Sequence, residues 1–271
     1  MSELTKRIVT ALVAAPVFLY LTWLGGYYFL IILLLISGII QLEIIRMIEK
    51  QEMKVLTPLA LLLGVPILLF VLFPATAWLF FLALLLLTFL IETFSHQVNG
   101  WKRLVTTVMV AVVVPAFFSG LLLLRNYQDD STGFILTLTL LLMVWSNDVF
   151  AYAGGKTMGK HPLAPSISPA KTIEGFVWGF VGSLLAVSLC KAFISGFPLS
   201  WGAAAGFAAV TGFFGPAGDL AESKLKRASG IKDSSGLMPG HGGFYDRFDA
   251  VMFSAPAAVI YLGILDFFGL F

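Results

Sequence analysis

Long apolar stretches separated by short polar segments dominate this chain. Nine stretches are about 17 residues or longer, enough to cross a hydrocarbon core of roughly 30 Å. They lie at residues 8–24, 28–48, 57–73, 75–93, 104–124, 133–155, 173–196, 200–226 and 247–269. The pattern predicts an all-α, polytopic integral membrane protein with about nine transmembrane helices. We expect a single membrane domain over residues 1–271, in which helices of 1–125 form a scaffold and helices of 133–271 carry the functional site.

Composition supports the membrane assignment. Hydrophobic residues make up 59% of the chain and charged residues 12%, whereas soluble domains are roughly 45–50% apolar. The net charge of +2 is too small to indicate a nucleic-acid partner. Lys6 and Arg7 before the first apolar stretch could also begin a signal peptide, but no clear small-residue cleavage site follows, so we predict a retained first helix.

The Lys and Arg residues predict the orientation. If the N-terminus and every second connection lie on one side, that side holds 15 of the 17 Lys and Arg residues, and only Arg125 and Lys191 lie on the other. Such an asymmetry is typical of cytoplasmic loops. We therefore expect a cytoplasmic N-terminus, an outer C-terminus, and a functional site that faces the cytoplasm from the cell (inner) membrane.

The segment 219–249 concentrates charge that a membrane protein normally avoids. It carries ten of the 32 formal charges of the chain, and charge in a membrane segment is costly unless it has a function. If the eighth stretch is helical to about residue 226, four polar residues share one helix face at spacings of three and four. They are Asp219, Glu222, Ser223 and Lys226. Glycines between 212 and 218 indicate a thin or broken helix just before Asp219.

A glycine-rich turn, residues 239–249, opens the last predicted helix. Its glycines, including Gly242 and Gly243, allow close backbone approach, and a helix N-terminus attracts phosphate. Asp246 and Asp249 project to one side and offer hard oxygen ligands to a divalent cation. His241 either donates to a phosphate oxygen or shapes the turn.

Basic residues in the same segment match the charge of a polyphosphate. They are Lys226, Arg227, Lys232 and Arg247. The alternative is a set of cations at the membrane surface that contact lipid headgroups. Because these cations are interleaved with carboxylates and glycines, we favour the polyphosphate.

A second polar region, residues 147–175, supplies another wall for a phosphate site. Asp148 and Tyr152 are four residues apart within an apolar helix, and Ser168, Lys171 and Thr172 follow in the next connection. The Gly-Lys pairs of this region do not form a Walker A loop. Alone they are a weak nucleotide signal, but the region lies on the same predicted side as residues 219–249.

These motifs together resemble a known family. The run Ser223-Lys-Leu-Lys-Arg, then Lys232-Asp, then Pro239-Gly-His-Gly-Gly-Phe-Tyr-Asp-Arg-Phe-Asp249 resembles the signature of phosphatidate cytidylyltransferases, the CDP-diacylglycerol synthases. The pair Asp148-x3-Tyr152 and the run Ser168-Pro-Ala-Lys-Thr-x-Glu-Gly175 are similar to that family as well. Met238 stands where Leu, Ile or Phe is more usual, a small departure.

The resemblance implies transfer of a cytidylyl group from CTP to phosphatidic acid. We expect Asp219 and Asp246 to bind Mg²⁺, with Asp249 and Glu222 as further carboxylates and room for a second cation, such as K⁺. The four cations Lys226, Arg227, Lys232 and Arg247 would neutralise phosphates. The expected substrate-binding residues are Asp148, Tyr152, Ser168, Lys171, Thr172, Ser223, Lys232, His241, Gly242 and Gly243.

Three other functions are compatible with these features. A CTP-dependent polyprenol or phytol kinase and an ether-lipid cytidylyltransferase have related loops, and a transporter would also have many spans and intramembrane carboxylates. The one-sided placement of polar residues disfavours a transporter. The motifs Gly175-x3-Gly179 and Gly202-x3-Gly206 fit close helix packing, within the chain or at the seam of a homodimer. The lipid bilayer is the remaining expected partner.

Overall fold

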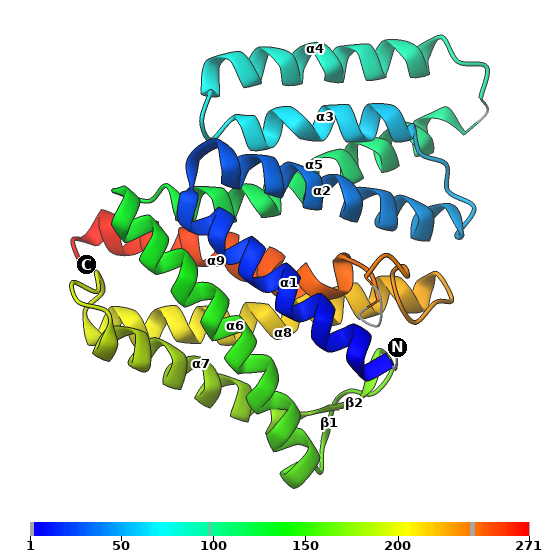
Figure 1. Cartoon of the computed structure of the whole chain (residues 1–271). Coiled ribbons are helices and arrows are strands. Elements are labelled where there is room, and N and C mark those ends of the chain that lie inside the picture. The colour runs from blue at the N-terminus through cyan, green and yellow to red at the C-terminus, as the bar shows by residue number, and fades with distance from the viewer. Residues whose placement is uncertain (1–2, 98, 239–241, 271) are drawn as a thin grey trace. The chain divides into compact units, whose positions relative to one another are not determined.

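The chain forms nine α-helices and one β-hairpin within residues 3–97, 99–238 and 242–270, which the computed structural model describes (Figure 1). The helices are α1 (Glu3–Leu24), α2 (Gly26–Glu49), α3 (Thr57–Leu69), α4 (Pro74–Thr93), α5 (Gly100–Arg125), α6 (Asp130–Met158), α7 (Ile173–Phe193), α8 (Trp201–Ala228) and α9 (Tyr245–Phe268). The strands are β1 (Pro162–Ala164) and β2 (Ser168–Thr172). The predicted all-α class is confirmed, because each predicted apolar stretch coincides with one helix.

Six of these helices are long and apolar enough to cross a membrane. They are α2, α4, α5, α6, α7 and α9. Helix α3 has 13 residues, about 20 Å at 1.5 Å per residue, which is shorter than a hydrocarbon core. Helix α8 has 28 residues but ends in a charged segment. The six apolar helices found among the described residues thus indicate an integral membrane protein.

Helix α8 is unbroken, contrary to the predicted thin or broken helix before Asp219. It runs continuously from Trp201 to Ala228. The glycines serve helix contacts instead. A Cβ atom at Gly212 would lie 3.0 Å from the Phe180 ring, and one at Gly218 would lie 2.3 Å from the carbonyl oxygen of Asp249. Small residues here allow neighbouring helices to approach α8 closely.

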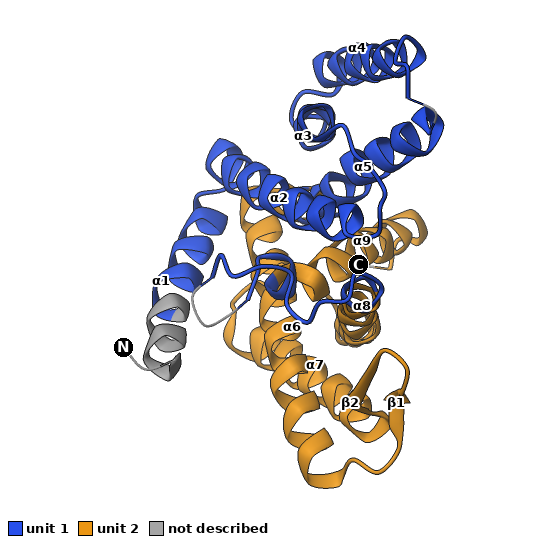
Figure 2. Cartoon of the chain, turned by 90° about the vertical axis from the view of Figure 1, so that its right-hand side faces the viewer, with its two compact units in different colours: residues 1–122, 225–247 blue, residues 123–224, 248–271 orange. Residues whose placement is uncertain are grey.

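The chain divides into two compact units (Figure 2). Unit 1 comprises residues 1–122 and 225–247, and unit 2 comprises residues 123–224 and 248–271. The first change of unit lies near the predicted boundary at residue 125. The return of 225–247 to the unit of the N-terminal helices is not foreseen by the sequence.

Buried polar side chains connect the helices of unit 1. The Gln41 side chain of α2 donates to the carbonyl oxygens of Ala60 in α3 (3.2 Å) and Val110 in α5 (3.3 Å). Arg103 of α5 forms an ion pair with Glu92 of α4 at 2.8 Å. Buried polar groups are costly unless they are hydrogen-bonded, so these bonds fix how the four helices pack.

Glycines bring α6 and α7 of unit 2 into close contact. A Cβ atom at Gly154 would lie 2.3 Å from the Trp178 ring, and one at Gly179 would lie 2.8 Å from the Asn147 side chain. Asn147 in turn donates to Ser183 Oγ at 3.2 Å. Gly175 and Gly179 therefore serve packing within the chain, one of the two roles expected for their motif.

The β-hairpin between α6 and α7 is a feature that the sequence analysis does not predict. Strands β1 and β2 pair antiparallel, with Pro162 opposite Thr172 and Ala164 opposite Ser168. The hairpin therefore gives the connection 159–172 a defined backbone, and it places Ser168, Lys171 and Thr172 on one strand.

Candidate active site

Three carboxylates of unit 2 gather where α8 meets α9. Asp219 and Glu222 lie three residues apart on α8, and Asp249 lies in the first turns of α9. One oxygen atom from each of the three carboxylates lies within 4.8 Å of those from the other two. Glu222 is 1% and Asp249 9% exposed. Three acidic side chains so close together form a group that a divalent cation would stabilise.

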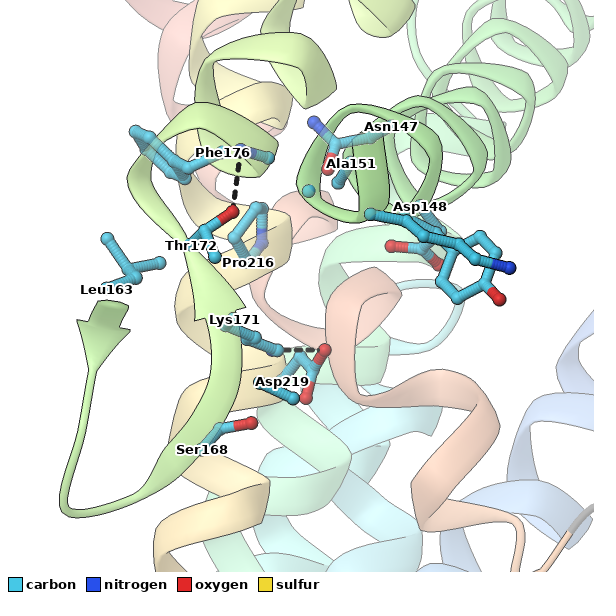
Figure 3. A pocket seen from close by; sticks show the side chains of 15 residues that line it. Asn147, Asp148, Ala151, Leu163, Ser168, Lys171, Thr172, Phe176, Pro216 and Asp219 are labelled. Atoms are coloured by element: carbon cyan, nitrogen blue, oxygen red, sulfur yellow. Dashed lines mark hydrogen bonds and ion pairs between the residues drawn. The ribbon is translucent and has the colours of Figure 1, made fainter. Parts of the chain in front are cut away.

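Lys171 of strand β2 brings positive charge to this group. Its Nζ forms an ion pair with Asp219 Oδ2 (Figure 3). The Asp219 side chain remains 36% exposed, so it is still accessible. Ser223, one turn further along α8, lies 3.4 Å from Asp219 Oδ1 through its hydroxyl. The predicted residues Lys171, Asp219 and Ser223 are thus brought together.

The hairpin is fastened at both of its ends to α7. Thr172 Oγ1 accepts a hydrogen bond of 3.1 Å from the Gly175 amide and so caps the helix. Glu174 accepts bonds from the amides of Lys160 (3.0 Å) and His161 (3.2 Å), and its other oxygen lies 2.6 Å from His161 Nδ1. These contacts hold the strand that carries Lys171.

A cavity of about 480 Å³ opens beside the Lys171–Asp219 pair. Helix α6, the hairpin, α7 and α8 all contribute to its walls (Figure 3). Phe176 and Pro216 provide apolar surface, and Asn147 and Lys156 provide polar groups. Six residues predicted for the site also line it: Asp148, Tyr152, Ser168, Lys171, Thr172 and Asp219. The predicted second wall and the Asp219 carboxylate of α8 therefore border one cavity.

Asp246, the fourth predicted metal ligand, belongs to unit 1. Its Oδ1 pairs with Lys226 Nζ at 2.5 Å. Its Oδ2 accepts bonds from the Ser234 amide (2.9 Å), the Ser234 hydroxyl (2.7 Å) and the Gly243 amide (2.9 Å). Asp246 thus connects Ser234 with Gly243 at the start of α9.

Glu43 of α2 is a residue of this region that the sequence analysis misses. It is fully buried and accepts hydrogen bonds from the amides of Phe244 (3.0 Å) and Tyr245 (2.8 Å) at the start of α9. A signal was present, because a carboxylate inside an apolar stretch is costly without partners.

The remaining predicted residues lie in the same unit as Asp246. Arg227, Lys232 and Arg247 are exposed, and Arg227 donates to the carbonyl of Ile231 at 3.4 Å. Gly242 has a φ of 81°, a conformation that only glycine adopts readily, so the turn requires it. His241 lies outside the described residues.

Comparisons with known proteins show which family the sequence of this chain resembles. A model of the cytidylyltransferase family matches residues 5–265. A phosphatidate cytidylyltransferase of Bacillus subtilis (strain 168) is 32% identical over 281 residues, which cover 98% of this chain and all of the relative. Proteins of the same name from Staphylococcus aureus (strain COL) and Staphylococcus haemolyticus are 33% and 32% identical, over 94% of this chain and 98% of each relative. With nearly its whole length matched, the chain belongs to the cytidylyltransferase family.

Proposed function

We propose that this protein transfers the cytidylyl group of CTP to phosphatidic acid, which gives CDP-diacylglycerol and pyrophosphate. The enzyme is a nucleotidyltransferase of phospholipid synthesis. The observation that carries the proposal is the Lys171–Asp219 ion pair beside the 480 Å³ cavity. Asp219 of this pair is one of the three clustered carboxylates. Relatives named phosphatidate cytidylyltransferase, similar over nearly the full chain, support the choice of substrates.

The reaction needs positioning and charge neutralisation more than covalent catalysis. A phosphate oxygen of phosphatidic acid attacks the α-phosphorus of CTP, and the bond from that phosphorus to the bridging oxygen of the β-phosphate breaks. Pyrophosphate leaves in line. In this proposal Lys171 holds a phosphate oxygen, and Asp148, Tyr152, Ser168 and Thr172, which line the cavity, orient the nucleotide. Preorganised charges of this kind lower the barrier.

The carboxylates fit a magnesium ion by their chemistry and spacing. Asp219, Glu222 and Asp249 each present an oxygen atom within 4.8 Å of the others, and carboxylate oxygens are the ligands that Mg²⁺ prefers. When bound, the cation supplies charge neutralisation to the phosphates. Asp246 stays a proposed further ligand, and binding there would require exchange of its ion pair with Lys226. A second cation, such as K⁺, is part of the same proposal.

The cations of residues 226–247 are proposed to neutralise phosphate groups. Arg227, Lys232 and Arg247 are exposed and suited to the triphosphate or to the lipid phosphate. Ser223, Gly242, Gly243 and His241 complete the proposed substrate-binding residues. A test is to substitute each cation by Gln, since loss of a phosphate contact raises the KM of that substrate more than it lowers kcat.

The membrane arrangement is proposed from the Lys and Arg asymmetry. With nine spans and a cytoplasmic N-terminus, 15 of the 17 Lys and Arg residues would lie at the cytoplasmic face of the inner membrane. The proposed site would lie at the same face. CTP is a soluble anion and phosphatidic acid is held in the bilayer, so a site at that face gives access to both.

A homodimer is also proposed. A Cβ atom added at Gly202 would meet no heavy atom within 4 Å, unlike one added at Gly206. The surface at Gly202 therefore has room for a helix of a second copy.

The test is an incubation of the purified full-length protein with Mg²⁺, phosphatidic acid and CTP labelled at its α-phosphorus. Label in the lipid together with pyrophosphate supports the proposal. A lipid kinase would release labelled CDP and leave the lipid unlabelled, and an ether-lipid enzyme would prefer the ether-linked phosphate. No labelled lipid with any divalent cation would refute the proposed reaction.

A further inference from the structure

Glu43 lies where an unsatisfied carboxylate would be costly. It belongs to α2, an apolar helix long enough to cross a membrane, and its side chain is fully buried. A buried charge is retained only where donors satisfy it. The partners of Glu43 therefore indicate its role.

Four donors surround this carboxylate, and all come from one segment of unit 1. The Phe244 amide and the Ser235 hydroxyl donate to Oε1 at 3.0 and 2.5 Å. The Tyr245 amide and the Ser234 hydroxyl donate to Oε2 at 2.8 and 3.0 Å. Phe244 and Tyr245 stand at the N-terminus of α9, where amides have no partner within their own helix. Glu43 thus caps α9 from another helix and connects Ser234 and Ser235 to the start of α9.

The same segment holds Asp246, so the two carboxylates are connected. The Ser234 hydroxyl lies 3.0 Å from Glu43 and 2.7 Å from Asp246. It carries a single proton and donates to one of them at a time. Asp246 also accepts from the amides of Ser234 and Gly243. A shift of the segment therefore moves the donors of Asp246 as well.

Gly243 shows how tightly this connection is packed. A Cβ atom at this position would lie 1.9 Å from Ser234 Oγ and 2.5 Å from Glu43 Oε1. No side chain fits there without displacing the hydrogen-bonded groups. The need for glycine at 243 follows from its contacts with Ser234 and Glu43.

We propose that Glu43 is a positioning residue for the transfer reaction. Through its hydrogen bonds it fixes Ser234, Ser235, Phe244 and Tyr245. Through these residues it fixes the Asp246 carboxylate and its ion-paired Lys226. The proposal rests on the proposed function for the reaction that is affected. It adds a residue of the N-terminal helices to those that govern catalysis.

The test compares Glu43→Gln with Glu49→Gln in the full-length protein in lipid nanodiscs. Glutamine has nearly the same size, but it places an NH₂ group against a donor. Glu49 is exposed on the same helix and is the matched control. In Glu43→Gln we expect faster hydrogen exchange of the amides at 242–246. We also expect a kcat lower by about 100-fold, the cost of a misplacement of about 1 Å, and a KM for CTP that changes less than kcat. In Glu49→Gln the hydrogen exchange, kcat and KM should all equal those of the wild type.

Two further variants keep the proposal testable if Glu43→Gln does not accumulate. Ser235→Ala removes one of the four donors and should give a smaller effect of the same kind, and Gly243→Ala should reproduce the effect of Glu43→Gln. Wild-type exchange at 242–246, or a wild-type kcat with altered exchange, would overturn the positioning role. Absence of transfer activity in the wild-type protein would refute the proposed function instead, and the exchange measurement would still decide whether Glu43 holds this segment.

Discussion

Gly218 of α8 packs directly against the backbone of Asp249 in α9. A Cβ atom at Gly218 would lie 2.3 Å from the Asp249 carbonyl oxygen and 3.0 Å from its carbonyl carbon. Asp219 follows Gly218 immediately, so this backbone contact sets the distance between Asp219 and Asp249. The close approach of the Asp219, Glu222 and Asp249 carboxylates therefore depends on the absence of a side chain at position 218.

Gly218→Ala should therefore damage the site through geometry alone. The added methyl group forces α8 and α9 apart, and we expect a loss of about 1–3 kcal/mol in stability from overpacking and of about 100-fold in kcat from misplaced carboxylates. Gly215→Ala is the matched control, because its Cβ would lie 3.4 Å from Ser254 Oγ, an ordinary contact. Initial rates and thermal melting in detergent check both variants. Equal rates for the two would contradict the role of the contact.

Asp219→Asn should abolish most turnover while the protein stays folded. The amide keeps the size of the side chain but loses the charge that pairs with Lys171 and that would hold a cation. We expect kcat to fall by about 10²–10³-fold, the cost of losing one preorganised charged contact. Asp246→Asn should lower kcat by a similar factor, because Asp246 is a proposed further Mg²⁺ ligand. Calorimetric titration measures Mg²⁺ binding by each variant, and the elution volume in size-exclusion chromatography shows whether the variant stays folded. Asp129→Asn, an exposed carboxylate outside the site, should keep wild-type turnover. Near-normal activity of Asp219→Asn would refute the metal assignment.

Hydropathy predicts the helices well and their ends less well. The sixth apolar stretch, 133–155, corresponds to α6, which extends from Asp130 to Met158. Hydrogen bonding rather than hydropathy sets the start of this helix, because the Asp129 side chain caps the first turn. The third stretch, 57–73, is longer than α3, because the chain must turn before Pro74 begins α4.

Local spacing predicts part of the site, and long-range contacts decide the rest. Asp219 and Glu222 share a helix face as their spacing requires, and Asp249 joins them from α9. Asp246 is only three residues from Asp249, yet its carboxylate is bonded to Lys226 and to the turn. Contacts of this kind, like those of Glu43, join residues far apart in sequence, and helical periodicity carries no information about them.

Thr172 should stabilise the hairpin and α7 through its cap. Thr172→Ala removes the acceptor for the Gly175 amide, and we expect a loss of about 1 kcal/mol and a higher KM for CTP, because Lys171 is its neighbour. Thr172→Ser keeps the hydroxyl and should restore most of both. Thermal melting and substrate titration separate the two effects. A serine variant as impaired as the alanine variant would show that the methyl group, which packs near Gly159, matters more than the cap.

Asp129 should give the start of α6 a dependence on acidic pH. Hydrogen bonds from the Thr132 hydroxyl, the Thr132 amide and the Ser131 amide lower the pKa of the Asp129 carboxyl from its ordinary value of 3.8. Because the folded state lowers this pKa, the stabilisation is complete above pH 3.8 and is lost as the pH falls through the lowered value. Hydrogen exchange of the amides at 131–133 should therefore become faster at low pH, relative to the intrinsic rate. Asp129→Asn still caps the helix but does not titrate, so its protection should stay constant across this window, whereas Asp129→Ala should lack protection at every pH. A wild-type profile as flat as that of the asparagine variant would contradict the carboxylate as the source of the effect.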